Sequence, residues 1–392
     1  MTERIYFDNA ATSHPKPECV YRAVDHFLRE VGASPGRSGH RLAISASRVV
    51  LEARERLAEL FGVDDSARVI LTDNCTEALN LAIKGSVGPG DHVVTSSVEH
   101  NSVMRPLRRL EADAGLELTV VGCTPEGRLD PADLAARLRP DTRLVVVTHA
   151  SNVVGTIQPV GEIGRLTRPR GILFLVDAAQ SAGAEAIDMP AMGIDMLAFS
   201  GHKGLLGPQG TGGLVLGEGV ELAPLKEGGT GSGSEHEIQP THLPDRYESG
   251  TLNGPGIAGL AAGAAYVQER GIGAIRQRLR HLTALLLAEL SGVPGVTVYG
   301  PRDPAKQTAV VSFTLAGMDI AELGALLDDR YGIMTRTGLH CAPAAHRTIG
   351  SFDRTRGTVR VSPGLFNTPE QVSHLGRCLR ELQEHGAGPH GN

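Results

Sequence analysis

The sequence predicts an α/β fold in which helices flank a mostly parallel sheet, followed by a smaller α+β domain. Short apolar runs rich in β-branched residues, such as 144–148 and 172–176, alternate with longer helical patterns through the first two thirds of the 392 residues. This alternation is typical of a parallel sheet whose two faces are both covered. After about residue 256 the pattern changes to a long helical region, then strands and a final helix.

Each predicted element follows from its local pattern. In the first part, strands are expected at 68–72, 92–95, 119–121, 144–148, 172–176, 196–199 and 213–216, and helices at 77–84, 103–114 and 131–138. In the second part, a helical region at about 257–290 with a bend near Gly271 precedes strands at 296–299 and 308–313 and helices at 319–329 and 369–384. We therefore expect a large domain at 18–256 and a small domain at 257–392, with residues 1–17 packing near the small one.

Composition excludes several classes of protein. The net charge of −6 and the lack of a basic block argue against nucleic-acid binding, and no apolar run is long enough to span a membrane. The amino terminus has an early acid and no apolar segment of the kind found in signal peptides. Five widely spaced cysteines without a C-x-x-C pair are consistent with a reducing compartment. These features predict a soluble cytoplasmic protein.

The strongest functional signal is an acid and a lysine at the ends of neighbouring predicted strands. Asp177 ends the run 172–176, and Lys203 follows the run 196–199 between Gly201 and Gly204. Only five of the 38 Lys and Arg residues are lysines, so a lysine in this loop indicates a need for an amine that loses its proton. Pyridoxal 5'-phosphate (PLP) requires this pair, because the lysine forms its Schiff base and the carboxylate keeps its pyridine nitrogen protonated. The apolar run before Lys203 argues against a solvated surface lysine.

Other polar residues also fall at strand ends, where ligands bind in parallel sheets. Thr76 is predicted as the N-cap of a helix whose free N–H groups would hold a phosphate, although the motif taken alone is better explained as an ordinary capping turn. His100 is a candidate to stack on a cofactor and move protons, or a plain core or surface histidine. Asn152 is a candidate to bond the cofactor's ring oxygen, or a turn residue. Ser200 and His202 flank the lysine and are candidates to contact the phosphate.

Together these motifs resemble the class V aminotransferase superfamily of fold-type I PLP-dependent enzymes. The resemblance covers nearly the whole chain and rests on residues 8–12, 76–80, 99–100, 151–155, 176–180, 200–203 and 248–253. Residues 336–343, Arg-Thr-Gly-Leu-His-Cys-Ala-Pro, are similar to the cysteine-bearing loop of the group II cysteine desulfurases and selenocysteine lyases. The resemblance therefore implies a fold-type I PLP-dependent transferase.

The resemblance also implies a role for each residue around the cofactor. Lys203 would bond PLP covalently, Asp177 would pair with the pyridine nitrogen, and His100 would stack on the ring and take part in catalysis. The remaining cofactor-binding residues would be Cys75, Thr76, Asn152, Gln180, Ser200, His202 and Thr251. Thr251 would reach the phosphate of a neighbouring subunit, which implies a homodimer.

The implied reaction converts L-cysteine to L-alanine. Arg360 would grip the substrate carboxylate, a task that suits a bidentate guanidinium, with Asn152, Arg336 and His340 beside it. Cys341 would take the sulfur as a persulfide and pass it to an acceptor protein or a small thiol. No metal site is predicted, because His340, Cys341 and His346 lack a fourth ligand.

Several alternatives stay open at this point. A selenocysteine lyase acting on L-selenocysteine would use the same residues, and a class V aminotransferase or lyase would not need Cys341. Cys341 would then be a core cysteine, and a non-enzymatic scaffold would need neither Lys203 nor Asp177. The chain departs from many relatives at Leu339, where they have histidine, at Cys75, and in the stretch 344–350. The last departure leaves the sulfur acceptor open.

Overall fold

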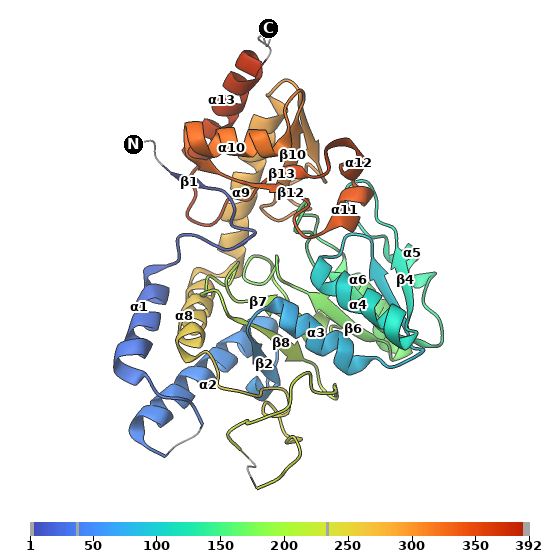
Figure 1. Ribbon diagram of the computed structural model, residues 1–392, viewed down its shortest axis with the longest axis vertical. Coiled ribbons are helices and arrows are strands. Elements are labelled where there is room, and N and C mark those ends of the chain that lie inside the picture. The colour runs from blue at the N-terminus through green and yellow to red at the C-terminus, as the bar shows by residue number, and fades with distance from the viewer. Residues whose placement is uncertain (1–3, 37–38, 233–234, 387–392) are drawn as a thin grey trace.

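The computed structural model describes residues 4–36, 39–232 and 235–386 and shows two layered regions joined by a long helical segment (Figure 1). The larger region is built on a seven-stranded sheet with the order β2-β8-β7-β6-β5-β3-β4. Its strands are β2 (Val69–Thr72), β3 (His92–Ser96), β4 (Glu117–Val121), β5 (Thr142–Thr148), β6 (Leu173–Asp177), β7 (Met196–Ser200) and β8 (Gly212–Leu216). Within the described ranges, no helix has both the length and the apolar character that crossing a membrane requires.

The sheet is mostly parallel, as predicted. Strands β7, β6, β5, β3 and β4 run in one direction, and β8 is antiparallel to both of its neighbours, β2 and β7. The parallel strands therefore deliver their carboxyl ends to one edge of the sheet, where the predicted site residues follow them.

Helices bury both faces of this sheet. They are α2 (Arg41–Phe61), α3 (Cys75–Ser86), α4 (Asn101–Ala114), α5 (Pro131–Ala135), α6 (Val160–Thr167), α7 (Met189–Met192) and α8 (Gly254–Arg270), and α1 (Glu18–His26) packs outside them against α8. Neighbouring residues of β5 show the two faces: Val145 packs in one apolar core with Leu57 of α2, and Val146 packs in the other with Leu79 of α3. Because side chains alternate along a strand, two covered faces require the continuous apolar runs seen in the sequence.

The second region contains a four-stranded antiparallel sheet with the order β12-β13-β10-β9. Its elements are α9 (Ile272–Ser291), β9 (Val296–Tyr299), β10 (Val311–Leu315), α10 (Ile320–Tyr331), β12 (Arg336–Gly338), α11 (Pro343–Thr348), α12 (Phe352–Thr355), β13 (Thr358–Val361) and α13 (Pro369–Gly386). A short parallel pair, β1 (Ile5–Tyr6) with β11 (Ile333–Met334), joins the amino-terminal segment to this region. The strand predicted at 308–313 begins only at Val311, because Thr308 instead donates its N–H to Gly155 O (2.8 Å) in the first region.

The helical region predicted at 257–290 is two helices that break at Gly271, where the bend was expected. Gly271 has a φ of +74°, a conformation that glycine adopts without the cost borne by other residues. We propose a division into two domains along the lines predicted, with residues 1–17 beside the small domain because Ile5 and Phe7 pack in its core. One adjustment concerns α8, whose Ile257 and Leu260 pack in the large core, so we place the boundary at Gly271 instead of residue 256.

A buried ion pair anchors the segment 248–253 to the large sheet. The Arg54 guanidinium donates to both carboxylate oxygens of Glu248 (2.8 and 2.5 Å) and to Val69 O, and Glu248 Oε1 also accepts from Leu71 N (2.6 Å). Both side chains are buried. We expect Arg54→Met to lower the free energy of unfolding by about 3 to 5 kcal/mol, because it leaves the Glu248 carboxylate buried without its counter-ion.

Urea denaturation of the two proteins measures this loss. The matched control is Arg22→Met, which removes an exposed i,i+4 pair with Glu18 and should change stability little. Equal effects of the two substitutions would show that the buried pair does not hold the segment.

Candidate active site

Nine of the predicted site residues line one cavity of about 210 Å³ at the carboxyl edge of the large sheet. They are Cys75, Thr76, His100, Asn152, Asp177, Gln180, Ser200, His202 and Lys203. They come from the segments that follow five different strands, which is how a parallel sheet gathers distant residues into one place. Among the remaining predicted residues, His340 and Arg360 hydrogen-bond to Asn152 of this lining. Arg336 contacts Cys341, and Thr251 lies elsewhere.

The helix α3 opens differently from the prediction. Its N-cap is Asn74, whose side chain accepts a hydrogen bond from Glu77 N (3.0 Å), so the prediction of Thr76 as the N-cap is wrong. Asparagine caps helices better than threonine, and Asn74 has the extended backbone that a cap requires. Thr76 lies within the first turn of α3, where its backbone N–H has no partner inside the helix. Its hydroxyl contacts Ser102 Oγ (2.8 Å).

His100 caps helix α4 and is held as a neutral ring. Its Nδ1 accepts from Ser102 N (3.0 Å) and contacts Ser102 Oγ (2.8 Å), so the ring carries its proton on Nε2. The pKa of His100 is lowered to about 4, mainly by burial, with Asp177 acting in the opposite direction. Ser102 thus links His100 to Thr76. The sequence analysis missed Ser102, although its position two residues after a histidine that follows a strand was a usable signal.

Asp177 and Lys203 face the same cavity from β6 and from the loop after β7. Asp177 is only 4% exposed, and its Oδ1 accepts from Ala179 N (2.9 Å) and from Cys75 Sγ (3.5 Å). Burial raises the pKa of the Cys75 thiol well above its ordinary value, so Cys75 stays a neutral donor to that carboxylate. Burial lowers the pKa of Lys203, with Asp177 acting in the opposite direction, and this favours a neutral amine.

The loop around Lys203 leaves no room for a side chain at Gly201 or Gly204. A Cβ atom on Gly201 would lie 2.2 Å from Thr211 Oγ1, and one on Gly204 would lie 2.3 Å from Ala182 O. The two glycines therefore let the chain pass close to its neighbours and hold the lysine in place. His202, between them, has a pKa of about 4 because of its burial.

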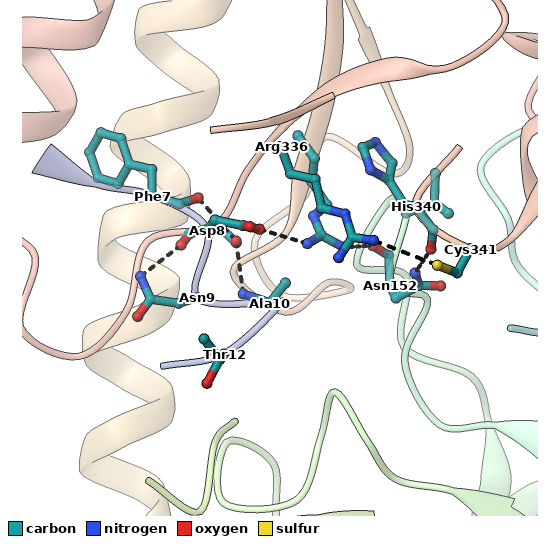
Figure 2. A network of polar contacts seen from close by, with 12 residues as sticks. Phe7, Asp8, Asn9, Ala10, Thr12, Asn152, Arg336, His340 and Cys341 are labelled. Atoms are coloured by element: carbon teal, nitrogen blue, oxygen red, sulfur yellow. Dashed lines mark hydrogen bonds and ion pairs between the residues drawn. The ribbon is translucent and has the colours of Figure 1, made fainter. Parts of the chain in front are cut away.

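Cys341 lies on an exposed loop between β12 and α11, and Figure 2 shows it beside Asn152, which lines the cavity. Arg336 Nη2 lies 3.6 Å from its sulfur. The backbone of the loop is tied to the strand ends, because Asn101 N donates to Cys341 O (2.8 Å) and Asn152 Nδ2 donates to His340 O (2.6 Å). His340 and Cys341 both have positive φ angles, +48° and +58°, so two consecutive non-glycine residues hold a turn that such residues rarely adopt.

The ring of His340 lies away from this contact. It is buried, and its Nε2 contacts Thr358 Oγ1 (2.9 Å) at the start of β13. Burial lowers the pKa of His340 well below its ordinary value, so the ring is neutral. His340 therefore contacts the site through its backbone carbonyl, which accepts from Asn152. Its ring instead connects the loop to Thr358 of β13.

Arg360 extends from β13 beneath the same loop and is 1% exposed. Its Nη1 donates to Asn152 O (2.9 Å), and its Nη2 donates to Asp8 Oδ1 (2.8 Å). Arg336 lies directly opposite Arg360 in the register of β12 and β13. The role of Asp8 as the partner of Arg360 was missed. An acid directly after the apolar run 5–7 marks a polar strand end, but nothing local indicates its partner.

Two predicted residues have contacts outside this group. Thr251 lines a separate cavity with Glu77, Lys226 and Asn253, so its expected reach toward a neighbouring subunit stays a prediction. Gln180 lines the main cavity but also donates from Nε2 to Ala10 O (2.9 Å), which ties the amino-terminal segment to the loop after β6.

Known proteins resemble this chain over almost its full length. Residues 5–375 match the model of the family "Aminotransferase class-V". A probable cysteine desulfurase of Methanothermobacter thermautotrophicus is 38% identical, over 97% of this chain and 95% of that protein, and a cysteine desulfurase of Yersinia pseudotuberculosis is 34% identical over 97% and 93%.

Solved structures agree with these sequence matches. The apo structure of a cysteine desulfurase from Thermococcus onnurineus superposes with a TM-score of 0.90 at 35% identity, over 97% of this chain and 95% of that one. A cysteine desulfurase from Escherichia coli gives a TM-score of 0.86 at 26% identity, over 97% and 95%. The fold and the resemblance inferred from the motifs are thereby confirmed. The chain belongs to the class-V aminotransferase family.

Proposed function

We propose that this chain is a PLP-dependent cysteine desulfurase that converts L-cysteine to L-alanine and transfers the sulfur through Cys341. The observation that carries the proposal is the connection between the two halves of the site. Asn152 lines the cavity of Lys203 and Asp177, and its amide donates to the loop that presents the exposed Cys341 thiol. The names of the relatives, cysteine desulfurases at 33–38% identity, support the same reaction.

The cavity residues fit PLP. The Lys203 amine makes no hydrogen bond or ion pair with any described residue, and His202 Nδ1 is buried there without a hydrogen-bond partner. Lys203 would bond the cofactor, Asp177 would face the pyridine nitrogen through the oxygen not used by Ala179, and Gln180 would contact the ring hydroxyl. Thr76, Ser200 and His202 would hold the phosphate together with the N–H groups of the first turn of α3. When bound, PLP supplies an electron-poor ring that weakens the Cα–H and Cβ–S bonds of the substrate.

Lys203 would also move the substrate's proton. Its lowered pKa favours the neutral amine, which is the form that accepts a proton from Cα. The ammonium that results can return a proton to the substrate at a later step, so Lys203 ends the cycle as it began. Asp177, buried and fixed by the Ala179 N–H, would present its carboxylate to the ring nitrogen.

Substrate binding falls to the groups around Asn152. The Arg360 guanidinium suits a carboxylate because its N–H groups form two parallel hydrogen bonds with one. Arg336 adds a second positive charge opposite Arg360 and beside Cys341. An α-carboxylate held there would place the substrate between Lys203 and the Cys341 loop.

Cys341 would then take the sulfur. Its thiolate attacks the substrate sulfur, so that an S–S bond forms as the Cβ–S bond breaks. The electron pair of the broken bond stays with the substrate carbon, which takes up a proton and leaves as alanine. Arg336, 3.6 Å from Sγ, stabilises negative charge on the sulfur. The terminal sulfur passes to an acceptor protein or a small thiol.

We also propose that the enzyme is a cytoplasmic homodimer with Thr251 of each chain facing the other chain's cofactor. The exposed position of Thr251 on a segment anchored by Arg54 and Glu248 supports this arrangement. The net charge of −6 supports partners other than nucleic acid.

The experiment is to incubate the PLP-loaded protein with L-cysteine and a reducing thiol and to quantify alanine and sulfide. The proposal predicts equal amounts of both products. A Cys19→Ala variant, which removes another exposed thiol far from the cavity, should behave like the wild type. A PLP-loaded protein that forms no alanine from L-cysteine would contradict the proposal, and turnover of L-selenocysteine alone would reassign it as a selenocysteine lyase.

A further inference from the structure

The buried guanidinium of Arg360 already has a carboxylate partner within the chain. Its Nη2 donates to Asp8 Oδ1 (2.8 Å), and its Nη1 donates to the backbone of Asn152 (2.9 Å). Its Nε is buried and has no hydrogen-bond partner among the described residues. The Nε donor of the guanidinium is thus unused, and the Asp8 carboxylate binds Nη2, the nitrogen that would act with Nε in holding a second carboxylate.

The position of Asp8 is set by its main chain. Asp8 O accepts from Tyr6 Oη (3.1 Å) and from Ala11 N (3.0 Å), and Asp8 pairs with Ser362 in an isolated parallel bridge. Within the described residues, the carboxylate itself hydrogen-bonds to Arg360 alone. Figure 2 shows Asp8 pointing from the amino-terminal segment toward the group formed by Arg336, Asn152 and Cys341. These main-chain contacts hold the segment in place, so a substitution of the Asp8 side chain leaves them intact.

We propose that Asp8 is a positioning residue that sets substrate affinity by occupying Arg360 until the substrate carboxylate takes its place. The proposal rests on the proposed function for the choice of an α-amino acid as the ligand. A buried guanidinium without a counter-ion is costly, so Asp8 stabilises the site between turnovers. A carboxylate that binds across Nε and Nη2 would compete with Asp8 for Nη2.

The charges around Arg360 support this exchange. Arg336 and Arg360 lie opposite each other on β12 and β13, and Asp8 is the carboxylate that pairs with Arg360 in the described residues. Two guanidinium groups and one carboxylate leave a net positive charge, which suits one more carboxylate. Asp8 thereby weakens substrate binding without removing it, which favours release of the product, alanine, since alanine has the same carboxylate.

The test compares wild type with Asp8→Asn, which keeps the shape of the side chain and removes its charge. Propionate, a carboxylate without an amine, is titrated into each PLP-loaded protein by calorimetry, and steady-state kinetics are measured with L-cysteine. We expect Asp8→Asn to bind propionate about tenfold more tightly and to lower the KM for L-cysteine by a similar factor, with kcat within about twofold of wild type. Asp8→Glu should restore affinities near those of wild type, because it keeps the negative charge.

Controls separate this effect from folding and from the proposed function. Asp25→Asn removes an exposed carboxylate paired with Arg29 on the first helices and should leave both constants unchanged. If Asp8→Asn does not fold, Asp8→Ser makes the same prediction. Unchanged or weaker propionate binding in the folded variant would overturn the proposal. Because propionate binding needs no turnover, this result is independent of whether L-cysteine is the substrate.

Discussion

Replacing Lys203 with alanine is expected to lower alanine formation from L-cysteine by about 1,000-fold or more, because the protein loses both the bond to PLP and the base for the Cα proton. The visible absorption band of the protein-bound cofactor should shift to that of PLP held without a covalent bond. Absorbance spectra and a product assay on the purified protein measure the two effects.

The matched control is Lys84→Ala, which removes an exposed lysine of α3 outside the cavity lining. It should leave both the spectrum and the rate unchanged. A Lys203→Ala protein that keeps the wild-type spectrum and rate would remove Lys203 from the mechanism.

Replacing Asp177 with asparagine is expected to lower kcat by about 100- to 1,000-fold, as found when a preorganised electrostatic contact is lost. Asparagine can still accept from Ala179 N through Oδ1, so the shape of the loop is kept while the negative charge opposite the ring nitrogen is lost. The measurement is kcat at saturating L-cysteine, with PLP content determined for each preparation.

Asp141→Asn is the control, since it removes an exposed carboxylate before β5, at the opposite end of the strands. Full activity of Asp177→Asn with PLP bound would show that the carboxylate does not act on the ring. If Asp177→Asn loses PLP and added PLP restores its full activity, the role of Asp177 is limited to binding the cofactor.

The sheet and its site were predictable because they depend on local signals. Each buried strand is a short apolar run, and the residues after it are polar, so the strand ends could be placed without any knowledge of the pairing. Lys203 was marked by the two glycines around it, which the close approaches to Thr211 and Ala182 require. The break of the long helix was also visible in the sequence, because the glycine at position 271 permits the positive φ found there.

The remaining features depend on contacts between distant segments. Asp8 and Arg360 are 352 positions apart in the sequence, and nothing local indicates that the main chain of residues 6–11 turns the Asp8 carboxylate toward β13. Thr76 was predicted as the N-cap of α3, but the N-cap is Asn74. Both residue types suit an N-cap, and only the backbone conformation of the turn decides between them. The strand predicted at 308–313 begins later, because Thr308 hydrogen-bonds to Gly155 in the large region and does not pair with a neighbouring strand.

The central claim is that sulfur passes through Cys341, and mass spectrometry of the protein after reaction with L-cysteine in the absence of a reductant tests it most directly. The account predicts one additional sulfur atom on the peptide that contains Cys341, in an amount equal to the alanine released. It also predicts that Cys341→Ala keeps its PLP and its spectrum but forms neither the persulfide nor sulfide. Alanine and sulfide formed at the wild-type rate by Cys341→Ala would contradict the account and indicate a lyase that releases sulfur directly from the substrate.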